Sequence, residues 1–238
     1  MVDKQPDSSL IQTESRPVTS TQTGPHPRLA QVVRRHLSNS SRRQAADHTR
    51  RAFESIASLI EARAQPLIFD SFCGTGMSTA LLASQHPDSF VIGIDKSAHR
   101  LQKHSGGTGE NYTLVRGDCG DFWRLALAAG WSAQKHYMLY PNPWPKPGHL
   151  QRRIHGSADL SNLLALGGDV ELRSNWQLYC EEFGVALVLA GLYPHIDEIK
   201  PKLPLTLFER KYLHSGHPLW RCRCQLGQNG PPGQLSPP

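Results

Sequence analysis

PLIFDSFCGTGM, residues 66–77, joins an apolar run, a turn and the start of a helix. Pro66 interrupts the helical pattern upstream, and a short apolar run bounded by turn residues is typical of a buried β-strand, here 66–72. Gly74 and Gly76 allow a tight turn and the close approach of a ligand to the backbone. The segment GMSTALLASQH (76–86) then predicts a helix.

Strands and helices continue to alternate toward the C-terminus, and 45–63 forms one more helical pattern before Pro66. Further strands are expected at 90–95, 112–118, 136–142, 169–175 and 217–225, and further helices at 96–104, 122–130, 159–168, 176–192 and 206–216. This order predicts an α/β fold with an open, mostly parallel sheet and helices on both faces.

Composition limits the domain organisation and the environment. The 238 residues carry a net charge of +6, which favours a polyanionic partner such as nucleic acid. Segments 1–27 and 227–238 are poor in large apolar residues, so we expect disorder there and one domain over 28–226, with a basic helical extension over 28–64. With no apolar run long enough for a membrane span and no secretory signal, a cytoplasmic protein is expected.

Two clusters leave alternatives open. The five arginines of 28–43 form either a solvated helix face or a phosphate-binding arm: Arg28, Arg34, Arg35, Arg42 and Arg43. Cys222 and Cys224 have a spacing that metal sites use, but no second Cys/His pair with finger-like spacing accompanies them. Alternate positions on a strand are the simpler interpretation, and no metal is expected.

Polar residues stand at the ends of five expected strands. They are Asp70, Asp95, Asp118, Asn142 and Asn175. The three acids among them have simple alternatives, Asp70 and Asp95 as helix caps and Asp118 as a turn former. Because ligands of open α/β sheets bind beyond the carboxyl ends of the strands, their succession predicts a binding site.

The first three acids indicate the kind of ligand. Asp70 precedes the glycine turn and would repel a pyrophosphate, but it suits a cationic ligand such as S-adenosylmethionine. Asp95 can accept hydrogen bonds from ribose hydroxyls. Asp118 can accept from an adenine amino group, and the N–H of Cys119 can reach a ring nitrogen. In this order the three resemble the donor site of class I S-adenosylmethionine-dependent methyltransferases.

YPNPWPKPG, residues 140–148, follows the fourth expected strand. Prolines fix φ and reduce the entropy lost on ordering, so the run predicts a preset loop beside the bound donor. The alternative is a proline-rich turn with a solvated basic end. Residues at its end suit RNA phosphates: Gly148, His149, Gln151, Arg152 and Arg153.

The loop and two later blocks resemble the tRNA (guanine-N7)-methyltransferase family. Pro141–Arg153 is similar to its P-D-P-W-P-K-x-R-H-x-x-R-R signature, Thr206–Arg210 to its T-K-F-E-R block, and Ser174–Trp176 to its T-D-W. The resemblance runs from about Leu67 to Arg223. It implies a class I methyltransferase with a Rossmann-like, seven-stranded sheet, S-adenosylmethionine as donor, and methylation of guanine N7 in the variable loop of tRNA.

The resemblance also implies roles for individual residues. Asp70, Asp95 and Asp118 fall on the donor-binding acids, and Asn142 falls on the acid that binds the donor and is called catalytic. Positions that hold the acceptor nucleoside are Lys146, Asn175, Thr206, Phe208 and Glu209.

Two family aspartates are replaced here, by Asn142 and Asn175. An amide keeps an acceptor oxygen and gains a donor, but it lacks the charge. Guanine N7 has a lone pair and no proton, so the reaction needs no general base. The leading interpretation is an active, monomeric enzyme. The alternatives are a non-catalytic RNA-binding paralogue, or a methyltransferase for another RNA or a small molecule; the intact donor acids argue against the paralogue.

Overall fold

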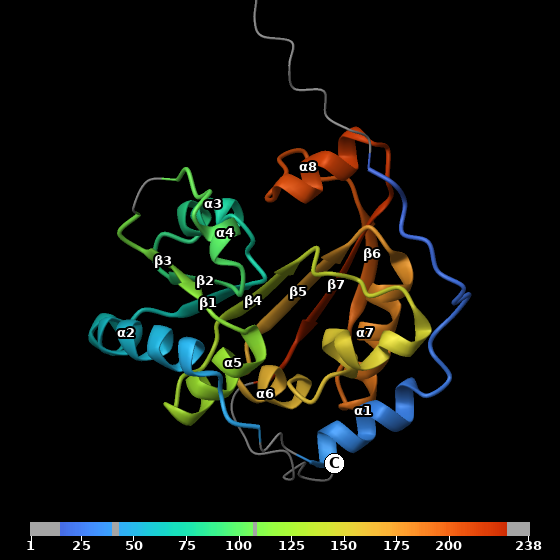
Figure 1. The fold of residues 1–238 in the computed structure, drawn as a ribbon, viewed down its shortest axis with the longest axis horizontal. Coiled ribbons are helices and arrows are strands. Elements are labelled where there is room, and N and C mark those ends of the chain that lie inside the picture. Colours follow the sequence, from blue (N-terminus) through green and yellow to red (C-terminus); the bar gives the residue numbers. More distant parts are fainter. Residues whose placement is uncertain (1–14, 40–42, 107–108, 228–238) are drawn as a thin grey trace, which may run out of the picture.

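Seven strands form one sheet in the computed structural model, which describes residues 15–39, 43–106 and 109–227 (Figure 1). The strands are β1 (Leu67–Ser71), β2 (Phe90–Asp95), β3 (Tyr112–Arg116), β4 (Lys135–Leu139), β5 (Asp169–Ser174), β6 (His195–Ile199) and β7 (Leu219–Gln225). Their order is β3-β2-β1-β4-β5-β7-β6, and the two pairings that β7 makes, with β5 and β6, are the antiparallel ones among the described strands. The predicted mostly parallel sheet is confirmed.

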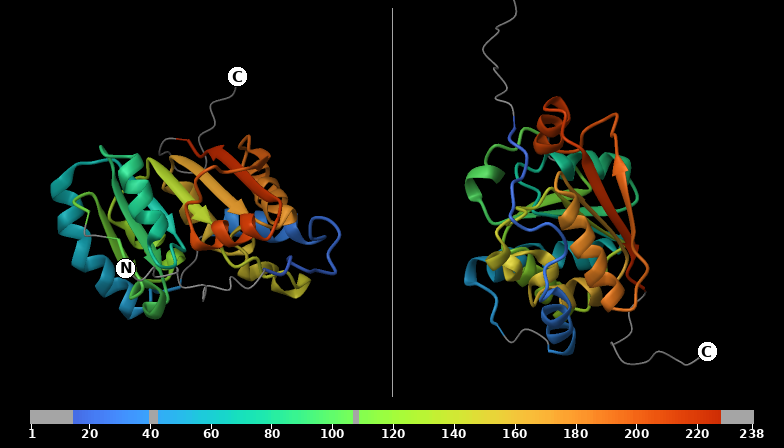
Figure 2. Two further views of the ribbon diagram at one scale, coloured as in Figure 1. Left: turned by 90° about the horizontal axis from the view of Figure 1, so that it is seen from above. Right: turned by 90° about the vertical axis from the view of Figure 1, so that its right-hand side faces the viewer.

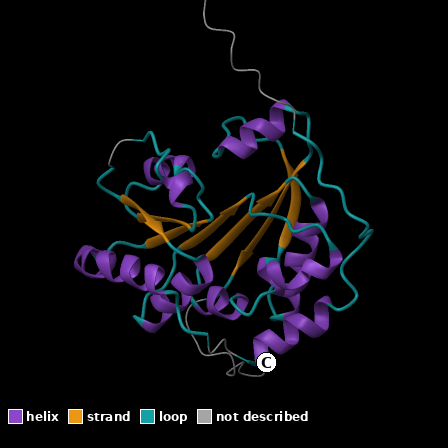
Figure 3. Cartoon of the chain, in the orientation of Figure 1, coloured by secondary structure: helices purple, strands orange, loops and turns teal. Residues whose placement is uncertain are grey.

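Helices lie on both faces of the sheet, as Figure 3 shows. The helices are α1 (Leu29–Ser38), α2 (Asp47–Arg63), α3 (Met77–Gln85), α4 (Ala98–Leu101), α5 (Cys119–Ala128), α6 (Leu160–Ala165), α7 (Gln177–Leu189) and α8 (Leu207–His214), with 3-10 turns η1 (Pro147–Arg152) and η2 (Ile154–Gly156). Among the described helices, none is long and apolar enough to cross a bilayer.

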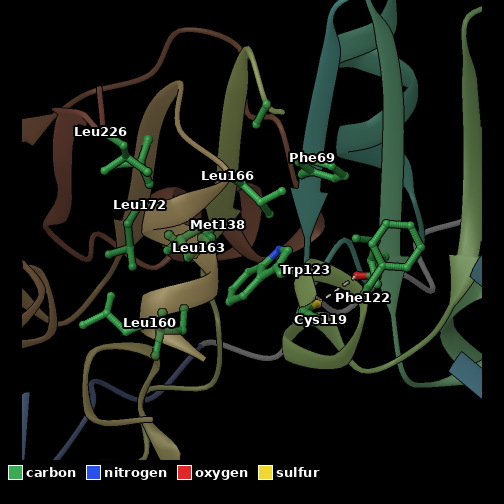
Figure 4. Packing of buried hydrophobic residues seen from close by; sticks show 14 of the residues in the cluster. Phe69, Cys119, Phe122, Trp123, Met138, Leu160, Leu163, Leu166, Leu172 and Leu226 are labelled. Carbon is green, nitrogen blue, oxygen red and sulfur yellow. Dashed lines mark hydrogen bonds between the residues drawn. The ribbon is translucent and has the colours of Figure 1, made fainter. Parts of the chain in front are cut away.

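Alternation along the strands divides the core into two layers. Phe69 of β1 faces α5, where it packs with Phe122 and other fully buried residues (Figure 4). Its neighbour Ile68 points to the opposite face and joins Leu82 of α3 in the second layer. A fully buried aromatic or aliphatic side chain stabilises the fold by about 1.5–3 kcal/mol relative to exposure. Both layers therefore hold β1 and its loop firmly in place.

The expectation of disorder over 1–27 is wrong for 15–27; residues 1–14, like 228–238, lie outside the described part. Residues 15–26, here called the N-terminal strap, run in extended form past the proline-rich loop to α8 (Figure 2). Ser20 Oγ donates to the Pro145 carbonyl at 2.6 Å, and the Ser15 N–H donates to Ser215 Oγ at 2.9 Å. Polar composition predicted no core, but the strap is ordered by hydrogen bonds.

The edge strand β6 does not stand out in the sequence pattern. Polar and apolar residues alternate only weakly in HIDEI (His195–Ile199). The strand has a single neighbour in the sheet and is exposed or half-buried along its whole length, so burial does not impose a clear pattern. By contrast, Cys222 and Cys224 lie on β7 and are buried on the same face of the sheet, as the simpler interpretation of that pair predicts.

Candidate functional site

The polar strand ends converge on one edge of the sheet. Because β1 to β5 are parallel, residues at or just after their carboxyl ends lie along the same side. The strand order reverses between β1 and β4, which is where such sheets bind ligands. A surface depression of about 730 Å³ lined by Gln134, Gly168 and Asp169 lies at the amino ends of β4 and β5 and so belongs to the opposite edge.

Asp70 is fully buried at the end of β1. Its Oδ2 accepts hydrogen bonds from Ser78 Oγ at 2.6 Å and Thr79 Oγ1 at 2.7 Å. Oδ1 has no hydrogen-bond partner among the described residues. Burial raises the pKa of Asp70 to about 6, although the two hydroxyl donors oppose this shift. A buried carboxylate with one oxygen unsatisfied is prepared for a cation, so the group fits a positively charged donor.

The loop after β1 turns through left-handed backbone. Phe72, Gly74 and Gly76 have φ of 66°, 62° and 75°. Space is open where a Cβ of Gly74 would stand, whereas a Cβ at Gly76 would meet Leu114 at 2.6 Å. Gly74 is thus required for its conformation, and Gly76 for conformation and space.

Asp95 ends β2 and is 2% exposed. Its carboxylate accepts from the N–H groups of Gly74 at 3.0 Å and Ser97 at 2.8 Å, and Arg100 Nη2 lies 3.1 Å from Oδ1. The acid therefore fixes the glycine loop. Since each carboxylate oxygen accepts more than one hydrogen bond, Asp95 retains capacity for hydroxyl donors.

Asp118 caps α5. Its Oδ1 accepts from the N–H groups of Gly120 at 3.1 Å and Asp121 at 3.2 Å. The cap explains why the helix begins at Cys119, three residues before the apolar pattern that predicts it. The N–H of a first helical residue has no partner within its helix. Cys119 offers that backbone group, while its thiol is buried and faces the Ile94 carbonyl.

The proline-rich loop is held in a compact turn. Tyr140 and Trp144 have φ of 56° and 47°, in the left-handed region. Asn142 is exposed, and its side-chain oxygen accepts from the Trp144 N–H at 3.2 Å. This hydrogen bond closes the turn from Asn142 to Trp144. The Lys146 carbonyl accepts from the His149 N–H at 2.9 Å and starts η1. The Lys146 side chain itself is exposed.

The expectation that Arg153 contacts RNA is wrong, because its side chain is fully buried. It pairs with Glu182 of α7 and donates to the Trp144 carbonyl at 3.2 Å and to Gln22 Oε1 at 3.1 Å. Arg153 thus joins the loop to α7 and the N-terminal strap. Its neighbour Arg152 is exposed and stacks over the Trp144 ring, with Cζ 4.8 Å from the centroid. The other residues predicted to contact RNA are also exposed or half-exposed: Gly148, His149 and Gln151.

Glu182 receives further donors and was not foreseen as important. His155 Nε2 lies 2.9 Å from Oε2, and Oε1 accepts from the Gln22 side chain at 2.6 Å and the His26 N–H at 2.7 Å. Burial opposes ionisation, but these hydrogen bonds and the Arg153 charge lower the pKa of Glu182 to about 2. The signal in the sequence is the pair of acids Glu181 and Glu182 within the largely apolar run of α7, of which only Glu182 is fully buried.

Glu209 does not face an acceptor pocket, contrary to expectation. It is fully buried and accepts from Tyr140 Oη at 2.8 Å, Arg173 Nη1 at 2.7 Å and the Leu205 N–H at 2.6 Å. Thr206 Oγ1 accepts from the Glu209 N–H at 2.9 Å and caps α8. The two residues fasten α8 over the edge of the sheet; the arrangement differs from a capping box in that Glu209 accepts from the N–H of Leu205 and not from that of the N-cap Thr206.

Asn175 and Phe208 remain on the accessible side. Asn175 Nδ2 lies 3.2 Å from His217 Nδ1, whose Nε2 lies 2.9 Å from the Ser15 carbonyl. An amide nitrogen only donates, so Nδ1 accepts and the Nε2–H donates to the strap. Phe208 is 47% exposed. His217 was not a predicted site residue, although it lies in the segment after the T-x-F-E block.

Comparisons with known proteins agree with the site chemistry. Residues 64–222 match a family model described as "Putative methyltransferase". A tRNA (guanine-N(7)-)-methyltransferase of Saccharophagus degradans is 29% identical over 66% of this chain and 74% of the relative. One of the same name from Nitrosospira multiformis is 28% identical over 68% of this chain and 75% of the relative.

Solved structures share the fold at lower identity. The 16S rRNA methyltransferase KamB superposes with a TM-score of 0.58 and 14% identity, covering 78% of this chain and 96% of that one. A mutant 16S rRNA (adenine(1408)-N(1))-methyltransferase from Catenulisporales acidiphilia, with cosubstrate SAM, gives 0.53 and 19%, covering 77% and 94%. At these identities the likeness concerns the fold alone.

Proposed function

Because this chain belongs to the methyltransferase family whose model matches residues 64–222, we propose that it transfers a methyl group from S-adenosylmethionine to N7 of a guanine in tRNA. One observation carries the donor assignment. The Asp70 carboxylate is buried, has an unsatisfied oxygen, and lies at the strand end beside a glycine turn. We place the reaction in the cytoplasm and expect a monomeric enzyme.

Each acid has a separate task toward the donor, which supplies an electrophilic methyl group on a sulfonium. Asp70 balances positive charge on the amino-acid part. Asp95 accepts from the ribose hydroxyls. Asp118 accepts from the adenine amino group, and the Cys119 N–H donates to the ring. The protein holds the methyl donor and the guanine in line, which replaces a bimolecular encounter by a fixed geometry. This positioning is the main contribution that the reaction needs from the protein.

The acceptor side lies along the proline-rich loop and α8. Guanine N7 attacks through its own lone pair, so no side chain has to remove a proton. Asn142, Lys146 and Asn175 surround the base as hydrogen-bonding groups, and the exposed end of η1 meets the RNA backbone. The variable loop of tRNA is the proposed target by resemblance to the family.

A labelling experiment tests this function. The purified protein is incubated with methyl-labelled S-adenosylmethionine and unmodified tRNA, and the RNA is digested to nucleosides. Label in 7-methylguanosine supports the proposal. No label despite calorimetric donor binding would redirect the search to another acceptor. No label and no donor binding would support a non-catalytic RNA-binding protein.

Arg152→Ala is expected to weaken tRNA binding roughly fivefold at low salt and to reduce the salt dependence of binding by about one phosphate contact. Arg152 is exposed, so the Tm should not change. Fluorescence anisotropy across a salt series measures both effects. Arg50→Ala, which removes an exposed arginine of α2, is the matched control. Equal loss in both variants would contradict a local contact.

Asn142→Asp is expected to raise kcat roughly tenfold, because a carboxylate stabilises the cation that forms on the methylated purine. Aspartate also accepts from the Trp144 N–H, so the turn is preserved. Single-turnover methyl transfer at saturating tRNA is the measurement. Asn39→Asp adds the same charge at the end of α1; it loses the hydrogen bond from Asn39 Nδ2 to the Arg35 carbonyl but should leave the methyl-transfer rate unchanged. An unchanged or lower rate would indicate that Asn142 is adapted to a different acceptor.

A further inference from the structure

Three aromatic rings form a stack along one flank of α8. The Phe208 and Tyr212 centroids are 6.1 Å apart with an interplanar angle of 25°, and those of Tyr212 and His217 are 5.4 Å apart at 13°. Tyr212 and His217 are half-buried, whereas Phe208 is 47% exposed. We call these three residues the ring stack. Its outer member is open to solvent.

The inner end of the ring stack touches the acceptor side of the proposed site. His217 Nδ1 lies 3.2 Å from Asn175 Nδ2, at the carboxyl end of β5. Tyr212 also contacts Tyr140, which precedes Asn142, with centroids 5.5 Å apart. The stack therefore leads outward from the carboxyl edge of the sheet to Phe208.

The ring stack stands on a fixed support. Buried Glu209 follows Phe208 directly and is held by Tyr140, Arg173 and the Leu205 N–H. Because neighbouring rings and the helix anchor restrict Phe208, little conformational entropy remains to be lost when a planar group stacks on it. An exposed aromatic side chain on a rigid element is suited to binding rather than to core packing.

One basic side chain neighbours Phe208 on α8. Lys211 follows at i+3 and therefore neighbours Phe208 on the helix surface. Arg210 and His214 are exposed at other positions of α8, and Lys202 is exposed in the segment before it, while the acid of α8, Glu209, is buried. Aromatic faces interleaved with basic side chains are the arrangement that binds unpaired nucleic acid, through base stacking and phosphate contacts.

We propose that Phe208 stacks an unpaired nucleobase adjacent to the methylated guanine, with Lys211 near its phosphate. This rests on the proposed function, because it takes RNA as the acceptor. Two rings separate Phe208 from Asn175, so the stacked base is a neighbour of the target and not the target itself. Phe208 thereby selects substrates whose target guanine lies in an unpaired segment.

Base stacking is tested without methyl transfer. tRNA transcripts carry 2-aminopurine at single unpaired positions of the variable loop, and the protein is titrated in without donor. We expect fluorescence quenching at an unpaired position next to the methylated guanine, which is located by replacing single guanines of the transcript with adenine and measuring the loss of label. Phe208→Tyr should retain the quenching. Phe208→Leu keeps an apolar side chain but removes the ring, and should abolish quenching and weaken binding roughly tenfold.

Leu207→Ala truncates the neighbouring exposed residue and should leave quenching intact. Thermal melting checks that each variant is folded. Quenching that persists in Phe208→Leu, or that occurs at no unpaired position, would overturn the proposal. A Phe208→Leu variant whose kcat falls at saturating tRNA would overturn it as well, since Phe208 would then hold the target base. Quenching without 7-methylguanosine would instead refute the proposed function while leaving RNA stacking standing.

Discussion

Asp70→Asn is expected to weaken S-adenosylmethionine binding roughly 100-fold at pH 8, and methyl transfer at fixed donor concentration should fall in proportion. Removing one member of a buried charge pair costs about 2–5 kcal/mol. The amide oxygen of the variant would still accept from Ser78 and Thr79, so the loop should keep its shape. Calorimetry with donor alone measures the loss. An affinity within threefold of the wild type would show that the unsatisfied oxygen does not serve the donor.

The raised pKa of Asp70 gives this binding a pH dependence. A cationic ligand favours the ionised carboxyl, so the pKa falls from about 6 on binding and a proton is released. Donor affinity should therefore rise as pH increases through about 6 and level off above 7. Calorimetry near pH 6 in two buffers of different ionisation enthalpy counts the proton. Asp70→Asn should show neither effect.

The same shift affects stability with the opposite sign. The pKa of Asp70 in the folded state lies above its unfolded value of 3.8, so the folded protein binds more protons between pH 4 and 6. Stability without donor should therefore fall across this window, by on the order of 3 kcal/mol from this group. Chemical denaturation at pH 5 and pH 8, with and without donor, measures the free energy of unfolding under each condition. At pH 8, bound donor should offset the stability that is lost in its absence.

Arg153→Ala is expected to lower the free energy of unfolding by about 3–5 kcal/mol, because the ionised Glu182 stays buried without its cation. The variant also loses the hydrogen bond to the Trp144 carbonyl. Methyl transfer should fall even where the protein remains folded, since the proline-rich loop is no longer fastened to α7. Urea denaturation at pH 7.5 and single-turnover rates at low temperature measure the two effects.

Arg152→Ala is the matched control for this prediction, because the two arginines are adjacent and only Arg153 is buried. Stability loss in both or in neither would contradict the buried network. Glu182→Gln should destabilise the fold comparably, since it leaves the Arg153 cation buried without a carboxylate and replaces one acceptor oxygen by a donor. The pKa of Glu182 is lowered from 4.5 to about 2, so its contribution is present above pH 4.5 and lost as pH falls toward 2.

Much of the fold follows from local patterns. The apolar runs of β1 and β2 and the acids at their ends are readable because these strands are buried over their full length. β6 could not be predicted from its own sequence because its burial depends on β7, a strand that begins 20 residues after β6 ends. The first residue of α5 is predicted too late because the N-cap Asp118, and not the apolar periodicity, determines where the helix begins.

The candidate site divides in a similar way. The resemblance to tRNA (guanine-N7)-methyltransferases is confirmed by relatives 26–29% identical to this chain. Motifs indicate which residues matter, but they do not separate contact from support. Arg153 and Glu209 carry charges that suggest ligand contacts, yet each is buried by a partner that its own motif does not contain: Glu182 in one case, Tyr140 and Arg173 in the other. Only the three-dimensional arrangement reveals these pairs.

The N-terminal strap has a consequence for folding during synthesis. Ser15 bonds to Ser215 and His217, which follow it by 200 and 202 residues. At about 5–20 residues per second, the ribosome makes His217 roughly 10–40 s after Ser15. Until then the strap has no docking surface on α8. The Ser15 end of the strap therefore reaches its native contacts only after α8 has been made, whereas the contacts of Ser20 with Pro145 and of Gln22 with Glu182 can form earlier.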